Sequence, residues 1–201
     1  VKDPFEAYDL VLALRSSGHA LALCPEEQRK HEYLTELARR RAAATSVARI
    51  VDMFKDRPTD FEWFCVDLFR TLGWRARPTP PSRDGGYDLS MVRSDGVTYI
   101  AECKCWSPRH HVGRPIIQKL HGANVVVRAR GMMVVTTSLF SQDAIAYAEQ
   151  AGVELVDGDG LMELCRRAWG LIPPSFVPAG SVRLTRGEIM SRIPADMRGR
   201  Y

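Results

Sequence analysis

One stretch of the sequence decides the fold, and it reads Arg-Asp-Gly-Gly-Tyr-Asp over residues 83–88 and Tyr-Ile-Ala-Glu-Cys-Lys-Cys-Trp over residues 99–106. Residues 87–93 and 98–105 alternate with period two and are rich in β-formers, and the Ser-Asp-Gly between them has turn chemistry, so they predict a β-hairpin. Side chains two apart on a strand share a face and lie roughly 7 Å apart. Glu102 and Lys104 therefore stand side by side, and Asp88 falls near the start of the first strand.

Inward charges on this strand need a partner, because Ile100, Ala101 and Cys103 surround them and an unpaired buried charge raises the free energy of the fold. Two carboxylates suit Mg²⁺, which completes its coordination shell with water and substrate phosphate. A lysine beside them is suited to orient or deprotonate an attacking water and to neutralise charge on the phosphate. The alternative is an ordinary Glu–Lys pair on a half-exposed strand. Asp88 upstream of the pair favours the metal site.

The elements around the hairpin predict the fold class, an α/β domain. In chain order we expect a helix from residue 59, a strand over 74–77, the hairpin, a helix from 115, a strand over 131–137, a helix through 150, a strand over 153–156 and a helix ending near 169. Helix-linked strands should be parallel and the hairpin antiparallel. The result is a mixed central sheet of about five strands flanked by helices.

Asp88 followed by Glu102-Cys103-Lys104 resembles the PD-(D/E)xK nuclease signature, and in particular its Mrr-like restriction endonuclease family. The resemblance covers about residues 59–169, and one departure is that Tyr87, rather than proline, precedes the aspartate. Further motifs of the family follow in order: Phe61-Glu62, Gly73-Trp74, His121-Gly122-Ala123, Val134 to Thr137, Phe140 to Ala144 and Leu155 to Leu161. Their order and spacing are together more specific than any one of them.

The resemblance implies a restriction-endonuclease-like core and a metal-dependent DNA endonuclease that acts in restriction or defence against foreign or modified DNA. It implies Mg²⁺ as cofactor, with Mn²⁺ able to substitute, no small-molecule cofactor, and double-stranded DNA as partner. The residues it marks as catalytic are Asp88, Glu102, Lys104 and Gln118, and those it marks as metal ligands are Asp88, Glu102 and Glu62. Two other classes stay open: a structure-selective nuclease for junctions or flaps in DNA repair, and a catalytically silent nucleic-acid-binding module.

Glu62 has two candidate roles. The sequence Thr59-Asp60-Phe61-Glu62 has the spacing of a capping box, which gives Glu62 to the N-terminus of its own helix. The family resemblance instead gives it a place beside the metal.

Basic residues flank the proposed site, and the net charge of +4 permits binding to nucleic acid without demonstrating it. Arginine makes bidentate contacts with phosphates. Adjacent histidines at 110 and 111 point apart on most loops, so a surface or phosphate-contacting role is favoured over metal ligation. The candidates for nucleic-acid binding are Arg83, Arg109, His110 and Arg114.

The chain divides by pattern into a helical extension over 1–57, a nuclease domain over 58–170 and a Pro/Gly/Arg-containing tail over 171–201. A helix is predicted from Pro4 to about Ser16, and a long charged helix from Pro25 toward Phe54. The second helix ends in an apolar stripe at Val47, Ile50, Val51 and Phe54. Docking on the nuclease core is favoured for this stripe, and a homodimer seam or a contact with an upstream domain are the alternatives.

Composition favours a cytoplasmic protein. No apolar run approaches the roughly 18 residues of a membrane span, and no targeting segment is visible. The five cysteines are odd in number and irregular in spacing, which fits reduced thiols better than a disulfide framework.

Overall fold

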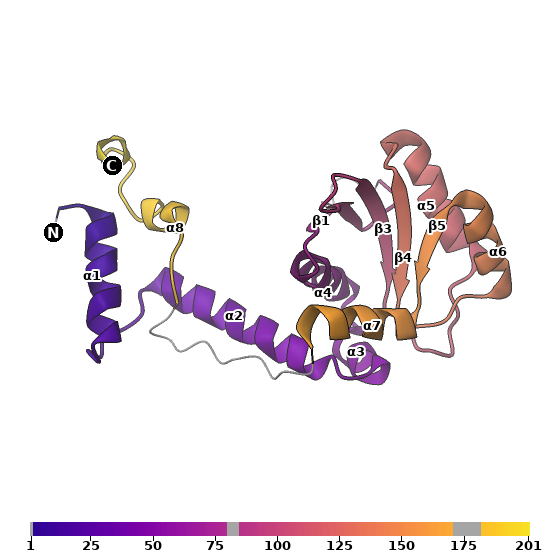
Figure 1. Ribbon diagram of the computed structural model, residues 1–201, viewed down its shortest axis with the longest axis horizontal. Coiled ribbons are helices and arrows are strands. Elements are labelled where there is room, and N and C mark those ends of the chain that lie inside the picture. The colour runs from indigo at the N-terminus through magenta and orange to yellow at the C-terminus, as the bar shows by residue number, and fades with distance from the viewer. Residues whose placement is uncertain (1, 80–84, 171–181) are drawn as a thin grey trace. The chain divides into compact units, whose positions relative to one another are not determined.

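The computed structural model describes residues 2–79, 85–170 and 182–201, and its contacts divide the chain into two units (Figure 1). Unit 1 comprises residues 1–40 and 174–201, and unit 2 comprises residues 41–173. The hairpin with Asp88, Glu102 and Lys104 lies in unit 2.

Unit 2 is built on one five-stranded sheet in the order β1-β2-β3-β4-β5. Strands β1 to β3 pair antiparallel, and β3, β4 and β5 pair parallel through helical crossovers, which confirms the predicted mixed sheet. The strands are β1 (Arg75–Pro78), β2 (Leu89–Val92), β3 (Thr98–Lys104), β4 (Gly131–Thr136) and β5 (Val153–Val156). The helices are α3 (Val47–Phe54), α4 (Pro58–Thr71), α5 (Arg114–Val127), α6 (Gln142–Ala151) and α7 (Gly158–Trp169).

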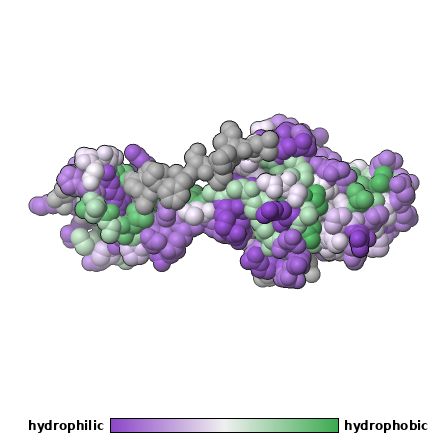
Figure 2. All heavy atoms as spheres, turned by 90° about the horizontal axis from the view of Figure 1, so that it is seen from below, coloured by the Kyte–Doolittle hydropathy of each residue, from purple (hydrophilic) through white to green (hydrophobic). Residues whose placement is uncertain are grey.

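Helices cover both faces of this sheet and create two cores. Helices α3, α4 and α7 pack on one face over Tyr99, Ala101 and Cys103 of β3. Helices α5 and α6 pack on the other face over Ile100 of β3, together with β4 and β5. The alternation of side chains along β3 therefore sends consecutive residues into different cores. Figure 2 shows hydrophilic residues over much of the surface seen in that view, as expected when the large apolar side chains are inside.

The apolar stripe docks on the core of unit 2, as favoured from the sequence. Ile50 and Phe54 are 0% and 1% exposed, and the Phe54 ring lies 5.2 Å from that of Phe64 in α4. The expected long helix from Pro25 is wrong, however, because it is interrupted after α2 (Pro25–Ala43). The Ser46 side chain accepts a hydrogen bond from the Arg49 N–H and begins α3 anew. This break separates the stripe from α2, and the contacts place the stripe in unit 2, which begins at residue 41. The domain boundary at residue 57 stays a prediction.

The predicted capping box at the start of α4 does not form. The helix begins at Pro58 with Arg57 as its N-cap residue, and the cap position makes no side-chain hydrogen bond. Proline suits the first helical position because the N–H it lacks has no partner there in any case. Thr59 therefore lies inside the helix, and Glu62 is not used as its cap.

Unit 1 joins the two ends of the chain. Helix α1 (Pro4–Ser16) is capped by Asp3 as predicted, and the Tyr8 hydroxyl donates to the Val182 carbonyl and accepts from the Leu184 N–H. The short helix α8 (Arg186–Met190) begins with a capping box, and a 3₁₀ turn follows at Arg198–Arg200. Within unit 1, Arg15 and the buried Glu27 form an ion pair of 2.6 Å. No helix within the described ranges has the length and apolar character needed to cross a membrane.

Candidate active site

Glu102 is a buried carboxylate at the centre of the site. It lies on β3, the middle strand, and its side chain is 0% exposed. The Lys104 Nζ lies 2.6 Å from Glu102 Oε1, so the two neighbours on one strand face form a close ion pair. The predicted juxtaposition on this face is therefore observed.

Asp88 lies beside this pair because the hairpin brings it there. Its backbone N–H donates to the Ala101 carbonyl at 2.8 Å, and its side-chain Oδ2 accepts from the Cys103 N–H at 2.7 Å. The same Oδ2 is 3.6 Å from Lys104 Nζ. Lys104 thus contacts a carboxylate on each strand of the hairpin, and Asp88 is fixed in direction by a backbone donor.

Lys119 is a site residue that the sequence interpretation missed. Its Nζ lies 3.3 Å from Glu102 Oε1, the same oxygen that Lys104 binds. The predicted residue Gln118 is exposed, and the described residues show no contact between it and a carboxylate. One side of α5 carries residues 116, 119, 120 and 123, which follow helical spacing. Ile116, Leu120 and Ala123 make this side apolar and turn it toward the sheet. The same spacing therefore indicates that Lys119 points toward the sheet as well.

The two oxygens of Glu102 differ in their surroundings. Both lysines lie on Oε1, while Oε2 is buried without a hydrogen bond in the part of the chain that the structure describes. Leaving a charged, buried acceptor unsatisfied is unfavourable, and a cation would satisfy it. Within residues 2–79, 85–170 and 182–201, no group of three or more His, Cys, Asp or Glu side chains is placed to hold a metal. Asp88 and Glu102 alone fit Mg²⁺, which commonly binds one or two protein carboxylates.

Glu62 of α4 lies within electrostatic reach of the two carboxylates. Burial raises the pKa of Glu62, and the negative charge of Asp88 raises it further, against the opposing effect of Lys104. Nearby anions and partial burial both disfavour a charged carboxylate. The charges of Asp88, Lys104 and Glu102 therefore act on Glu62, whose side chain does not cap α4. Its role as a metal ligand stays a prediction.

Lys104 carries a positive charge in this structure. Burial works against that charge, but the hydrogen bond to Glu102 and the charge of Asp88 prevail, and the pKa of Lys104 is raised. The amine is therefore an ammonium at neutral pH. In this arrangement it donates hydrogen bonds and does not accept a proton.

The loop before Asp88 passes close to α5. Gly86 has a φ of +77°, and a Cβ there would lie 3.2 Å from Ala123 Cβ and 3.8 Å from Lys119 Cε. Only glycine adopts this conformation at such a distance without strain. The conformation of Gly86 therefore lets the chain pass beside Lys119 two residues before Asp88.

The candidates for nucleic-acid binding have different surroundings. Arg83 lies outside the described residues. Arg109 and His110 are exposed in the loop after β3, where the His110 ring lies 4.3 Å from that of Trp106. Arg114 is engaged within unit 2, 3.4 Å from Asp143 and 4.8 Å above the Tyr147 ring. These roles stay predictions.

Buried hydroxyl groups hold the loop that follows β3. Thr136 Oγ1 donates to the Lys104 carbonyl at 2.7 Å, Thr137 Oγ1 to that of Trp106 at 2.7 Å, and Ser138 Oγ to that of His110 at 2.7 Å. The end of β4 thus fixes the backbone from the catalytic strand to His110. Thr136, Thr137 and Ser138 thus hold this loop through their hydroxyl groups, whereas the sequence predicted only that a buried strand ends near residue 137.

A mixed five-stranded sheet that carries two carboxylates and a lysine on its middle hairpin has the architecture of a restriction-endonuclease-like nuclease domain. The sequence agrees, since the model of a family described as restriction endonuclease, Mrr_cat, matches residues 55–165. The chain belongs to this Mrr-type restriction endonuclease family.

Individual relatives extend the match. The chain is 30% identical over 168 residues to the type IV methyl-directed restriction enzyme EcoKMrr of Escherichia coli (strain K12), covering 79% of this chain and 53% of that enzyme. It is 29% identical over 112 residues to the uncharacterized protein y4cE of Sinorhizobium fredii (strain NBRC 101917 / NGR234), covering 52% of this chain and 29% of that protein. The chain thus spans about half the length of EcoKMrr and less of y4cE.

A solved structure shares the fold. The DNA modification-dependent restriction endonuclease AspBHI superposes with a TM-score of 0.51 at 24% identity, over 76% of this chain and 38% of that one. At this identity the likeness concerns the fold alone.

Proposed function

We propose that unit 2 is a metal-dependent DNA endonuclease that hydrolyses phosphodiester bonds. The observation that carries the proposal is the buried Glu102, whose Oε2 has no hydrogen-bond partner among the described residues. Glu102 lies beside Asp88, and the Lys104 ammonium contacts both carboxylates. Most buried polar atoms of folded proteins have a hydrogen-bond partner, so a buried carboxylate oxygen without one calls for an explanation. The arrangement is suited to receive a cation.

The position of each residue in the site suggests its role in the reaction. Asp88 and Glu102 would hold Mg²⁺, or Mn²⁺ in its place. Such an ion would supply Lewis acidity, which makes water a better nucleophile at neutral pH. Lys104, an ammonium between the carboxylates, positions the attacking water and stabilises negative charge on the phosphate. Glu62 and Gln118 are further candidates for the site, Glu62 as a third carboxylate and Gln118 from the first turns of α5.

Lys119 is placed to balance charge. Its ammonium and that of Lys104 together neutralise Glu102, and its side chain is 49% exposed, so it can leave the carboxylate without becoming buried elsewhere. We assign it the role of holding the buried carboxylate in position until a cation takes over the charge. This is a positioning role, because Lys119 acts through Glu102.

The description of a sequence relative supports a substrate class for this proposal. EcoKMrr is described as methyl-directed. We propose modified double-stranded DNA as the substrate, in restriction of foreign DNA. The homodimer remains part of this proposal, since a single site of this kind cuts one strand and paired cuts need two sites or two events.

The test is a cleavage assay with methylated and unmethylated plasmid, with Mg²⁺ or with chelator. We expect the full chain to convert plasmid to nicked or linear forms only with the metal. Lys104→Ala should lose cleavage by at least the roughly 10²-fold expected for removing one electrostatic contact to the reacting group, while it still binds DNA. Equal cleavage with chelator, or full activity of Lys104→Ala, contradicts the mechanism.

A further inference from the structure

The half of the sheet formed by β1 and β2 carries two arginines on the same face as the site. Arg75 pairs with Val92 and Arg77 with Ser90, and these in turn pair with Thr98 and Ile100 of β3. Paired residues of neighbouring strands share a face, and so do alternate residues of one strand. Arg75 and Arg77 therefore face the same side as Glu102 and Lys104.

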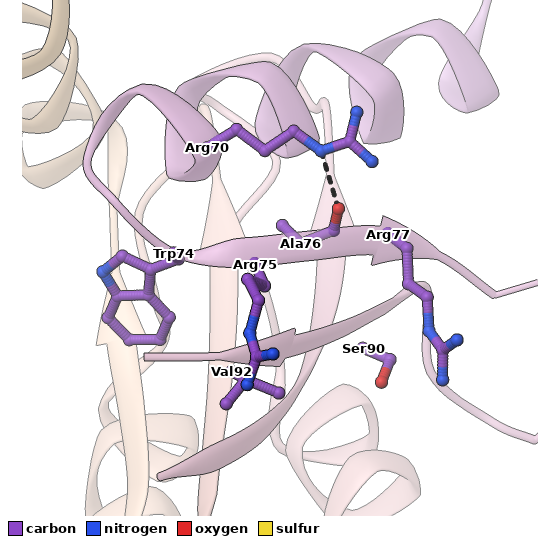
Figure 3. A pocket seen from close by; sticks show the side chains of 7 residues that line it. All are labelled: Arg70, Trp74, Arg75, Ala76, Arg77, Ser90 and Val92. Atoms are coloured by element: carbon purple, nitrogen blue, oxygen red, sulfur yellow. Dashed lines mark hydrogen bonds between the residues drawn. The ribbon is translucent and has the colours of Figure 1, made fainter. Parts of the chain in front are cut away.

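This part of the face is open. Helices α5 and α6 pack over β3, β4 and β5, whereas both arginines are exposed and Ser90 and Val92 are only half-buried. A hollow of about 700 Å³ lies at this edge of the sheet (Figure 3). Arg75, Arg77, Ser90 and Val92 line it from this face, and Ala76, Trp74 and Arg70 of α4 line it from the side of the other core. No carboxylate lines it among the described residues.

The arginines of the hollow are available to a ligand. Within the described ranges, the side chains of Arg75 and Arg77 have no hydrogen bond or ion pair, whereas Arg41, Arg93 and Arg114 elsewhere in unit 2 are paired with aspartates. Arg70 donates its Nε to the Ala76 carbonyl at 2.8 Å, the dashed line in Figure 3. Guanidinium groups around one hollow repel one another unless an anion lies between them.

The spacing fits an extended anion. Arg75 and Arg77 are alternate residues of β1 and lie ~7 Å apart. Arg77 pairs with Ser90 of the neighbouring antiparallel strand β2. Asp88 precedes Ser90 by two residues and so lies ~7 Å beyond it, on the side away from Arg75. The row from the site to Arg75 is thus ~14 Å long, which is the length of several consecutive phosphates of one DNA strand. A small anion would occupy only part of it.

We propose that the open face of β1 and β2 binds the phosphodiester backbone of duplex DNA next to the phosphate that is cut, through Arg75 and Arg77. The inference rests on the proposed function and extends it by naming the surface that positions the substrate. Arginine forms bidentate contacts with phosphate, and such contacts set position without reading sequence. Arg75 and Arg77 were part of a basic cluster in the sequence, but only the strand register shows that they share the face of the site.

The test measures binding of the full chain to a fluorescent duplex by anisotropy, with chelator present so that no strand is cut. The variant Arg75→Gln/Arg77→Gln is compared with Arg130→Gln/Arg167→Gln, which removes the same charge at the start of β4 and on α7. We expect the first variant to lower the slope of log K against log salt by about 2 and to bind on the order of 50-fold more weakly at ~0.1 M salt. The control should keep the slope of the unaltered chain.

Cleavage adds a second readout. In the Arg75→Gln/Arg77→Gln variant, KM for DNA should rise while kcat is largely kept, because the arginines act on binding and Lys104 on the reaction. Melting temperatures of both variants should match that of the unaltered chain, since all four side chains are exposed.

The outcomes separate this inference from the nuclease proposal. An unchanged salt slope in Arg75→Gln/Arg77→Gln, an equal loss in the control, or no duplex binding by the unaltered chain overturns the inference. A chain that binds with the expected slopes but never cuts DNA with Mg²⁺ keeps the binding surface and refutes the nuclease.

Discussion

The two faces of β3 differ in what they bury, although they belong to one strand. On the side of α3, α4 and α7, Tyr99, Ala101 and Cys103 pack in a core of apolar side chains. On the other side, Ile100 packs with α5, but the next inward residue is the charged Glu102, at 0% exposure. Both faces thus contribute an apolar core, but only the face of α5 and α6 also places a charged residue of β3 in the interior, where the Lys104 and Lys119 ammonium groups lie against it.

Breaking the apolar face should have the largest effect on stability. Ile50→Asp buries an unpaired charge at a position that is 0% exposed, and we expect the free energy of unfolding to fall by roughly 2–5 kcal/mol. Chemical denaturation measures it. Ala48→Asp adds the same charge at an exposed position of α3 and should change stability by less than about 0.5 kcal/mol. A folded Ile50→Asp variant of unchanged stability but reduced mass would show instead that the stripe is a dimer seam.

A double-mutant cycle without metal measures how strongly Glu102 and Lys104 of the charged face depend on each other. Lys104→Met leaves the buried Glu102 with only the more distant Lys119, and the loss should be about 3 kcal/mol. Adding Glu102→Gln removes the buried charge, so Glu102→Gln/Lys104→Met should recover part of the loss. If the loss of unfolding free energy in the double variant equals the sum of the losses in the two single variants, Glu102 and Lys104 do not stabilise each other.

The loop that joins the charged face to α5 should respond more weakly. Gly86→Ala forces a positive φ on a residue with a Cβ and crowds Ala123, so it should cost about 1–2 kcal/mol. Cleavage should fall as well, since the loop positions Asp88. Gly96 also has a positive φ, +86°, but open space around it. Gly96→Ala should therefore show the backbone cost without the loss of cleavage, and equal losses of cleavage in both variants would argue against a positioning role for Gly86.

The smallest effect concerns pH. The pKa of Glu62 is raised above the value of 4.5 taken for the unfolded chain, because burial and the charge of Asp88 favour its neutral form. The folded state thus holds this proton more tightly, and stability is lost as pH rises from 4.5 through the folded pKa. Without metal, Glu62→Gln should melt higher than the unaltered chain at neutral pH, and the difference should vanish below pH 4.5.

A matched control isolates this effect. Glu149→Gln changes an exposed glutamate on α6 and should follow the unaltered chain at each pH. If Glu62→Gln melts lower than the unaltered chain at neutral pH, the carboxylate is stabilised by its surroundings and the electrostatic picture of the site is wrong.

The sequence by itself determined the hairpin, the order of the elements and the shared face of Glu102 and Lys104. These follow from local geometry, because alternation on a strand and turn chemistry act within a few residues. The parallel pairing of β4 and β5 followed as well, since helical crossovers leave little choice.

Tertiary structure alone decided which helical residue reaches the site and which segments associate. Lys119, rather than Gln118, contacts Glu102. Consecutive side chains of a helix point in directions that differ by about 100°, so the rotation of α5 about its axis decides which of the two reaches the site. The packing of Ile117 and Leu120 against the sheet sets that rotation. Tyr8 and Leu184 bond across 176 residues, a contact that no local pattern encodes. Packing between distant segments sets such positions, because the free energy that fixes them comes from surface buried only in the assembled fold.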